Sequence, residues 1–370
     1  MGYRDRLIKL EDILEKSLQR KSLSASEIIY LLELTEGNQI SRVFRTAKYM
    51  RAKYFGQKVF LYGFVYFSTH CRNNCTFCAS RISNKLARRY RKSESEIVEA
   101  AGQLAESRVH LIDLTMGEDP FYLRSERGFD SLLKTIQKVK KETGLPLMIS
   151  PGVVSKDVLA EFVKAGVDWY ACYQETHNRQ LFSSLRPEQD YDSRLSSKIT
   201  ARRLGILIEE GILTGVGENS SDIVYSMEVI KSLEASQARV MSFVPQVGTP
   251  MYDRKSPSRL RELMTIAVLR LLYPDRLIPA SLDIDGLDLL QERLEAGANV
   301  ITSLIPPRLG LSGVSQPSLG IDEGFRTVQG VAPLLDQMGI EAATNQDYFQ
   351  WVCREKAALA CGPAHYEAVA

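Results

Sequence analysis

The chain has 370 residues, enough for two or three domains or for one large α/β barrel. Hydrophobic residues make up 44% and charged residues 25%, a composition that excludes wholesale disorder. The formal net charge is only +2, whereas a dedicated nucleic-acid-binding protein usually carries a strong basic excess. We therefore expect no nucleic-acid partner.

The first residues are charged and lack the apolar stretch of a secretory signal. The longest apolar run, residues 59–67, is too short to cross a membrane. We therefore expect a cytoplasmic protein without membrane contact, whose six cysteines are reduced and free for chemistry.

Residues 1–56 are predicted to form a helical extension that precedes the main fold. Ser24 and Glu27 have the spacing of a capping box and stand ahead of an apolar helical pattern. A further helix is expected over residues 42–54. The character of the sequence then changes, because residues 59–68 are aromatic and β-branched, which is typical of a buried strand.

From there on, strand-like runs alternate with amphipathic helical stretches. The strands are expected at 59–68, 109–116, 146–150, 167–173, 212–216, 239–244, 276–282 and 299–304. The first helix between these strands is expected to start at Ser93, with Glu96 completing a second capping box. Further helices are expected near 128–141, 155–165, 192–209, 221–235, 257–272, 286–296 and 322–338.

This alternation predicts an α/β fold, a (β/α)8 barrel of the TIM type over residues 57–338. Residues 339–370 are expected to be a C-terminal tail. An open, doubly wound sheet is the alternative, but we find no point in the sequence where its strand order would reverse.

Half of the cysteines fall within eight residues, as Cys71, Cys75 and Cys78 in the spacing C-x3-C-x2-C. Structural zinc usually has four protein ligands, and the only nearby fourth ligand would be His70. An iron–sulfur cluster held by three thiolates would keep one iron open to an outside ligand. Zinc and unliganded thiols remain alternatives on spacing alone, and the open cluster is favoured.

Polar or glycine-rich turns follow nearly every predicted strand. Catalytic groups of such barrels lie at the C-terminal ends of the strands, so we expect the site there. The basic run from Arg81 to Lys92 is interpreted instead as a solvated face, since the overall charge is near neutral.

Three charged residues, Asp113, Arg239 and Asp283, stand in or beside apolar strands. A buried unpaired charge costs several kcal/mol, so each must have a partner. They either pair with one another and stabilise the barrel, or face a ligand in its mouth. Two carboxylates and one guanidinium are complementary to a diamino acid.

The cysteine spacing, with the aromatic Phe77 just before the last cysteine, resembles the radical S-adenosylmethionine superfamily. The resemblance implies that the three thiolates hold a 4Fe–4S cluster, whose open iron binds S-adenosylmethionine and yields a 5′-deoxyadenosyl radical. It also implies cofactor contacts at strand ends. The positions that match are Phe77, Gly117, Glu118, Ser150, Glu175, Arg194 and Gly215. Met116 departs from the usual glycine, so we expect mainly backbone contacts there.

A narrower resemblance, over residues 50–310, is to the methylornithine synthase family. It is carried by the stretches 113–120, 173–176, 210–217 and 278–283. It implies an isomerase that rearranges L-lysine to (3R)-3-methyl-D-ornithine in pyrrolysine biosynthesis. The radical does the chemistry, so no further catalytic residue is implied, and a donor such as flavodoxin or ferredoxin supplies electrons. The implied substrate-binding residues are Asp113, Arg239, Ser281, Asp283, Thr302 and Ser303.

An FeFe-hydrogenase maturase, or another amino-acid-directed enzyme of the superfamily, is the main alternative, followed by a radical lyase. Sulfur insertion would need a second cluster, and only Cys172 remains within the barrel. A metal-binding scaffold without turnover is the non-enzymatic alternative. No role is assigned to Cys353 and Cys361.

Overall fold

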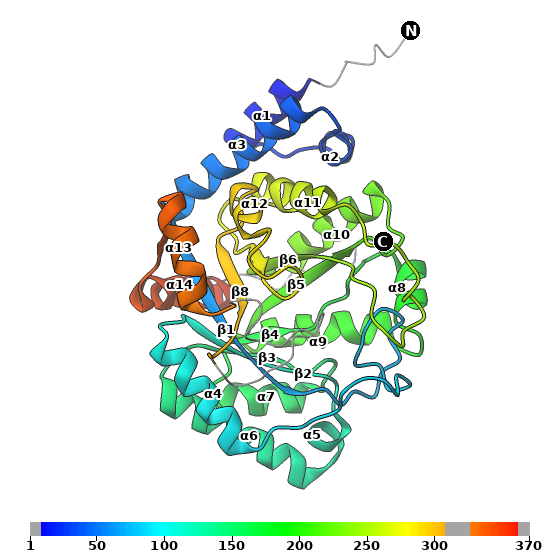
Figure 1. Ribbon diagram of the computed structural model, residues 1–370, viewed down its shortest axis with the longest axis vertical. Coiled ribbons are helices and arrows are strands. Elements are labelled where there is room, and N and C mark those ends of the chain that lie inside the picture. The colour runs from blue at the N-terminus through cyan, green and yellow to red at the C-terminus, as the bar shows by residue number, and fades with distance from the viewer. Residues whose placement is uncertain (1–8, 308–325, 362–370) are drawn as a thin grey trace.

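The computed structural model of the protein describes residues 9–307 and 326–361. Eight parallel strands surround the centre of the molecule, and helices cover them on the outside (Figure 1). The strands are β1 (Lys58–Ser68), β2 (Leu111–Met116), β3 (Leu147–Ser150), β4 (Trp169–Ala171), β5 (Leu207–Thr214), β6 (Gln237–Ser242), β7 (Pro279–Ser281) and β8 (Val300–Leu304).

The strand order β6-β5-β4-β3-β2-β1-β8-β7 places the first strand between the second and the last. A parallel bridge between Gln237 and Leu277 joins β6 to the segment that leads into β7. The sheet therefore curves into a nearly closed barrel. This confirms the predicted fold class, and the open doubly wound sheet is wrong.

The outer layer follows the amphipathic pattern of the sequence. Its helices are α4 (Glu94–Glu106), α5 (Pro120–Arg124), α6 (Glu126–Thr143), α7 (Lys156–Lys164), α8 (Arg179–Leu185), α9 (Tyr191–Arg203), α10 (Ser220–Ser232), α11 (Arg259–Leu272), α12 (Leu290–Glu295) and α13 (Val328–Met338). Ser93 and Glu96 cap α4 in the predicted way. No helix in the described ranges is both long and apolar enough to cross a membrane.

Three further helices precede the barrel. They are α1 (Leu10–Leu18), α2 (Ala25–Leu32) and α3 (Gly37–Phe55), and the capping box of Ser24 and Glu27 opens α2. They project from the side of the barrel at which α11 and α12 lie (Figure 1). Buried Val43 and Ala47 of α3 belong to the same hydrophobic core as the barrel helices.

The prediction was wrong at β5. We expected a helix up to residue 209 and a strand from 212, whereas α9 ends at Arg203 and β5 already begins at Leu207. The cause is the pair Glu209 and Glu210, which looks like an exposed helical surface in the sequence. Both side chains are buried and pair with cations on the two faces of the strand.

The segment that we expected to be a tail covers the N-terminal end of the barrel. The short strand β9 (Glu341–Ala342) pairs with the start of β1, and α14 (Asn345–Cys361) follows it. From α14, Trp351 stacks on Trp169 at the base of the barrel interior, with ring centroids 5.9 Å apart. The hydroxyl of Tyr348 lies 2.6 Å from that of Tyr62. Substrate access is thus left to the opposite end.

Replacing Trp351 with Ala should destabilise the whole barrel, because the indole ring fills its base. We expect a loss of about 3–5 kcal/mol in the free energy of unfolding, the usual cost of truncating a buried large aromatic residue. Urea unfolding followed by circular dichroism measures it. Phe349→Ala is the matched control on the same helix, since the Phe349 side chain is 59% exposed. Equal effects of the two changes would contradict the closing role of α14.

Candidate active site

A cavity of about 250 Å³ opens at the C-terminal ends of the strands. All eight barrel strands contribute residues to its wall, as does the cysteine loop that follows β1. Apolar side chains such as Phe64, Leu213 and Phe243 alternate in this wall with buried charged groups. The cavity is therefore a desolvated chamber in which electrostatic interactions are strong.

The three cysteines of the loop, Cys71, Cys75 and Cys78, all line this cavity. Cys75 Sγ accepts hydrogen bonds from Arg186 Nη1 at 3.3 Å and from Gln189 Nε2 at 3.1 Å. Burial, and then the neighbouring thiolates of Cys75 and Cys71, raise the pKa of Cys78 to about 12. Three ionised thiols at this place therefore need positive charge between them.

Two glycines give this end of the cavity its shape. A Cβ atom on Gly117 would lie 2.4 Å from the backbone oxygen of His70, so only glycine lets the β2 turn pack on the cysteine loop. Gly152 has φ +79°, and a Cβ there would lie 1.9 Å from Cγ of Glu118. Glycine is thus required at both positions, because the neighbouring loop approaches the backbone too closely for a Cβ atom.

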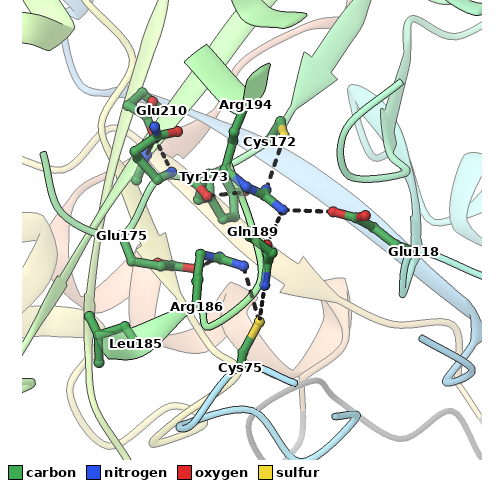
Figure 2. Close-up of polar contacts among 12 residues, drawn as sticks. Cys75, Glu118, Cys172, Tyr173, Glu175, Leu185, Arg186, Gln189, Arg194 and Glu210 are labelled. Carbon is green, nitrogen blue, oxygen red and sulfur yellow. Dashed lines mark hydrogen bonds and ion pairs between the residues drawn. The ribbon is translucent and has the colours of Figure 1, made fainter. Parts of the chain in front are cut away.

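The Arg194 guanidinium is the centre of a buried polar network (Figure 2). Its Nη2 donates to Glu118 Oε1 at 2.6 Å and to Gln189 Oε1 at 2.8 Å. Its Nη1 donates to Cys172 Sγ at 3.1 Å. Burial opposes the charge of Glu118, but Arg194 and Arg72 outweigh it and lower the pKa of that carboxyl. Glu118 is therefore ionised at neutral pH.

A second ion pair lies beside the first. Glu175 Oε1 accepts a hydrogen bond from Arg186 Nη2 at 2.7 Å, and the same guanidinium reaches Cys75 (Figure 2). Glu175 has φ +69°, an uncommon backbone conformation for a residue other than glycine. The strained turn directs its carboxylate into the cavity that it lines.

These ion pairs leave polar atoms of the cavity wall without a partner. Among residues 9–307 and 326–361, no hydrogen bond is made by the buried atoms Nε of Arg194, Nε of Arg186 and Oε2 of Glu175. Buried polar atoms of folded proteins are rarely left unsatisfied. A ligand that carries a carboxylate and hydroxyl groups, as S-adenosylmethionine does, would satisfy them.

The donor set also fits a cluster. In the described ranges, no group of three or more His, Cys, Asp or Glu side chains is arranged to hold a metal ion directly. A four-iron cluster requires a different arrangement, since each thiolate binds its own iron. The thiols of Cys71, Cys75 and Cys78 around one cavity, with cationic donors behind Cys75, match that requirement.

The deeper end of the cavity holds Asp113 and Arg239. Arg239 Nε donates to Glu209 Oε1 at 2.8 Å, and its Nη1 donates to Thr302 Oγ1 at 2.8 Å. Asp113 Oδ1 accepts a hydrogen bond from Ser150 Oγ at 3.3 Å. Within the described residues, Oδ2 of Asp113 and Nη2 of Arg239 have no hydrogen-bond partner. One acceptor and one donor therefore remain for a ligand.

Asp283 completes this end. Its Oδ1 accepts a hydrogen bond from Arg326 Nη1 at 2.9 Å, and the Tyr66 hydroxyl lies 3.3 Å from the same oxygen. Arg326 is not among the residues that line the cavity, whereas Asp283, Ser281 and Ser303 are. The guanidinium thus supports the carboxylate from behind. Asp113, Arg239 and Asp283 make no ion pairs with one another, because Arg239 pairs with Glu209 and Asp283 pairs with Arg326.

Two of the predicted site residues do not line the cavity. Gly215 lies in a turn in which the Glu218 carboxylate accepts hydrogen bonds from three successive backbone N–H groups. Thr302 is buried behind Arg239. All the other predicted residues line it, namely Phe77, Gly117, Glu118, Ser150, Glu175, Arg194, Asp113, Arg239, Ser281, Asp283, Ser303 and the three cysteines.

Four polar residues that line or support the site were not predicted, namely Arg186, Gln189, Glu209 and Arg326. Arg186 and Gln189 lie in the connection between α8 and α9, where a polar residue looks like ordinary loop. Of these four, only Glu209 could have been recognised from the sequence, because it is one of two adjacent charged residues directly before the apolar stretch 211–216.

Comparison with known proteins agrees with this geometry. The model of the radical SAM superfamily matches residues 65–230. A 3-methylornithine synthase of Methanosarcina acetivorans is 40% identical over 334 residues, which cover 90% of this chain and 94% of that protein. A crystal structure of methylornithine synthase is 38% identical with a TM-score of 0.87, over 92% of this chain and 99% of that one. The FeFe-hydrogenase maturase subunit HydE of Thermotoga maritima is 30% identical, over 73% of this chain and 76% of that protein.

The carboxyl group of Asp113 should make stability depend on pH. Burial, and then the negative charge of Glu209, raise its pKa from 3.8 to about 7 despite the nearby Arg239. The native protein therefore binds more protons than the unfolded chain between about pH 4 and pH 7, so this group removes stability as the pH rises through that range.

Asp113→Asn keeps the shape of the side chain and removes the ionisation. We expect the variant to be more stable than the parent at pH 8 without substrate, by up to roughly 4 kcal/mol, and to gain less at pH 5. Melting curves of the two proteins at both pH values measure the difference. A gain that is equal at pH 5 and pH 8 would contradict the raised pKa.

Proposed function

We propose that this chain is a lysine mutase, because it belongs to the 3-methylornithine synthase family of the radical SAM superfamily. It isomerises L-lysine to (3R)-3-methyl-D-ornithine, the first step of pyrrolysine biosynthesis. The observation that carries the proposal is 40% identity over 94% of a 3-methylornithine synthase, together with a cavity that presents carboxylates and a guanidinium.

The enzyme uses a 4Fe–4S cluster and S-adenosylmethionine. When bound, these groups supply the carbon radical that takes a hydrogen atom from the substrate. The thiolates of Cys71, Cys75 and Cys78 would hold the cluster. Arg186 and Gln189 donate hydrogen bonds to Cys75 Sγ, so they stabilise its negative charge and fix its position.

The ion pairs of Glu118 and Glu175 form the cofactor end of the chamber. Glu118 holds Arg194 in place, and the unsatisfied Nε of that guanidinium can donate to a carboxylate. Arg186 holds Glu175 in the same manner, and Oε2 of Glu175 can accept hydrogen bonds from the ribose hydroxyls. Each arginine thus has a fixed carboxylate partner and a remaining donor.

The substrate end matches a diamino acid. The planar guanidinium of Arg239 would bind the lysine carboxylate, because Glu209 and Thr302 fix it and leave Nη2 directed at a ligand. Asp113 and Asp283 would bind the two ammonium groups. The hydroxyls of Ser281 and Ser303, 3.3 Å apart on neighbouring strands, lie beside Asp283 in the cavity wall.

A closed chamber suits a rearrangement through two fragments. Fragmentation between Cα and Cβ would give a glycyl part and an aminobutene part whose apolar chain ends in an ammonium group, and both must stay together and away from water until they rejoin. The charged groups can hold the ends of both fragments. The apolar side chains between them, such as Phe64 and Leu213, exclude water from the middle.

The maturase-like alternative is not favoured. Its relative HydE is 30% identical to this chain, against 40% for the methylornithine synthase. The distribution of charge at the substrate end also favours a diamino acid, since Asp113 and Asp283 are two separate acceptors for cations.

The electron donor and the location of the enzyme follow from the same chemistry. Reduction of the cluster requires a one-electron carrier, such as flavodoxin or ferredoxin. Cysteines that hold an iron–sulfur cluster must stay reduced, which supports a cytoplasmic location.

The cysteine assignment predicts which thiols hold iron. Cys78→Ala should lose the brown chromophore and most of the iron after anaerobic reconstitution, because no other thiol of the loop can replace it. Cys172→Ala is the control, since Cys172 also lines the cavity but accepts a hydrogen bond from Arg194. Iron and sulfide analysis together with absorption spectra measure both. Four irons per chain in the Cys78→Ala protein would refute the assignment.

The substrate assignment is tested by incubating the reduced enzyme with S-adenosylmethionine and lysine and by separating lysine isomers by chromatography and mass. We expect a 3-methylornithine product from the parent. Asp283→Asn should lower product formation at least tenfold, since it removes the charge that pairs with an ammonium group.

Asp288→Asn is the matched control, because this exposed carboxylate lies in the same connection after β7. Cluster content and S-adenosylmethionine binding should stay at the parent level in both variants. Normal turnover in Asp283→Asn would contradict the substrate assignment, and no isomer from the parent would contradict the proposed function.

A further inference from the structure

We propose that the surface above the cysteine loop is the docking site of a small acidic one-electron carrier protein. This inference rests on the proposed function, since a cluster at this place is what the carrier would reduce. The surface, here called the basic apolar patch, is formed by residues 82–88 and 247–255.

Large apolar side chains are exposed on both segments of the patch. Ile82 is 55% exposed and Leu86 is 73% exposed, and both follow the last cysteine closely in the sequence. Val247 is 57% exposed and Tyr252 is 50% exposed, in the loop after β6. Apolar side chains that gather on one exposed face are typical of interaction sites.

The two segments form one surface because Asn84 joins them. Its buried amide Nδ2 donates to the backbone oxygen of Ala79 at 2.9 Å and to that of Val247 at 2.8 Å. Gly248 makes this contact sterically feasible, since a Cβ atom there would lie 2.1 Å from Asn84 Oδ1. The exposed residues therefore stand on a fixed frame.

The same frame is bonded to the cysteine loop. The backbone N–H of Ile82 donates to the carbonyl of Asn73 at 2.8 Å, and that of Ser83 donates to the Asn74 side chain at 3.3 Å. Both asparagines lie between Cys71 and Cys75. An electron that arrives at the patch would thus reach the cysteine ligands through a few covalent and hydrogen bonds.

The charge of the patch specifies the partner. Residues 79–92 contain no acidic residue, and Lys85 and Arg88 are exposed. Arg254 and Lys255 are exposed on the second segment, next to Asp253 as its one acidic residue. Electropositive charge around apolar side chains complements an acidic protein and speeds its association.

The basic run from Arg81 to Lys92 thus contains two kinds of residue, those that hold the structure together and those that are exposed to a partner. Arg89 donates to the carbonyls of Ser80 and Arg81, and Arg91 pairs with Asp119 at 2.8 Å, so both are structural. Our interpretation of the whole run as a solvated face holds only for residues such as Lys85 and Arg88. These exposed cations are what the carrier would contact.

In the transfer, one electron passes from the reduced carrier to the oxidised cluster, and no atom is exchanged.

The test compares two double variants of the cluster-loaded enzyme that change the net charge equally. Lys85→Glu with Arg88→Glu alters the patch, and Lys134→Glu with Lys141→Glu alters the exposed face of α6. Binding of purified acidic flavodoxin and of ferredoxin is measured by biolayer interferometry at low and high salt. The rate of 5′-deoxyadenosine formation is measured with each reduced carrier and with dithionite.

We expect the patch variant to bind the carriers at least about tenfold more weakly at low salt, and the α6 variant to bind like the parent. Carrier-driven rates should fall in the patch variant, while dithionite-driven rates stay unchanged in all three proteins. Leu86→Ser should weaken binding at high salt as well, because its contribution is apolar.

Equal binding by the patch variant and the parent would overturn the proposal, as would the absence of carrier binding to the parent. A parent that binds the carriers but forms no 5′-deoxyadenosine with dithionite contradicts the proposed function and leaves the docking site supported. The two hypotheses therefore fail by different measurements.

Discussion

The site depends on guanidinium groups buried inside an apolar barrel. Arg194, Arg186 and Arg239 are each removed from water, and each is held by a buried carboxylate. A buried charge without such a partner costs several kcal/mol, so the pairs make the charges tolerable. Because each partner occupies only part of the guanidinium, further donors remain for ligands that are themselves charged. The chamber can therefore bind zwitterions away from water.

The two carboxylates at the substrate end are compensated differently. Asp283 has the guanidinium of Arg326 behind it, whereas Asp113 accepts a hydrogen bond from the hydroxyl of Ser150, and its pKa rises to about 7. A bound ammonium group would supply the charge that Asp113 lacks, and would favour its ionised form. In the proposed substrate complex, binding of an ammonium group and the ionisation of Asp113 would thus be coupled.

Much of the fold followed from local patterns, because those patterns act over a few residues. The capping boxes of Ser24 and Ser93 start helices as expected, and the apolar runs form strands. The cysteine spacing places all three thiols on one cavity. Ion pairs between distant segments were not predictable in this way. Arg326 reaches Asp283 across 43 residues and Arg186 reaches Cys75 across 111, and only the closed barrel makes these contacts.

The error at β5 has the same origin and shows how the two ends of the site are connected. Adjacent residues of a strand point to opposite faces, so Glu209 faces the barrel interior and fixes Arg239 at the substrate end. Glu210 faces the outer helices, where its carboxylate pairs with Lys198 and accepts a hydrogen bond from the backbone N–H of Gln174 at 2.8 Å.

Burial opposes the charge of Glu210, yet Lys198 and His177 outweigh it and lower the pKa of that carboxyl to about 2. Glu210 is therefore a permanent anion, and the residue that it anchors directly precedes Glu175 at the cofactor end. Two neighbouring glutamates of β5, which resemble a solvated helix surface in the sequence, thus hold Arg239 and the backbone next to Glu175.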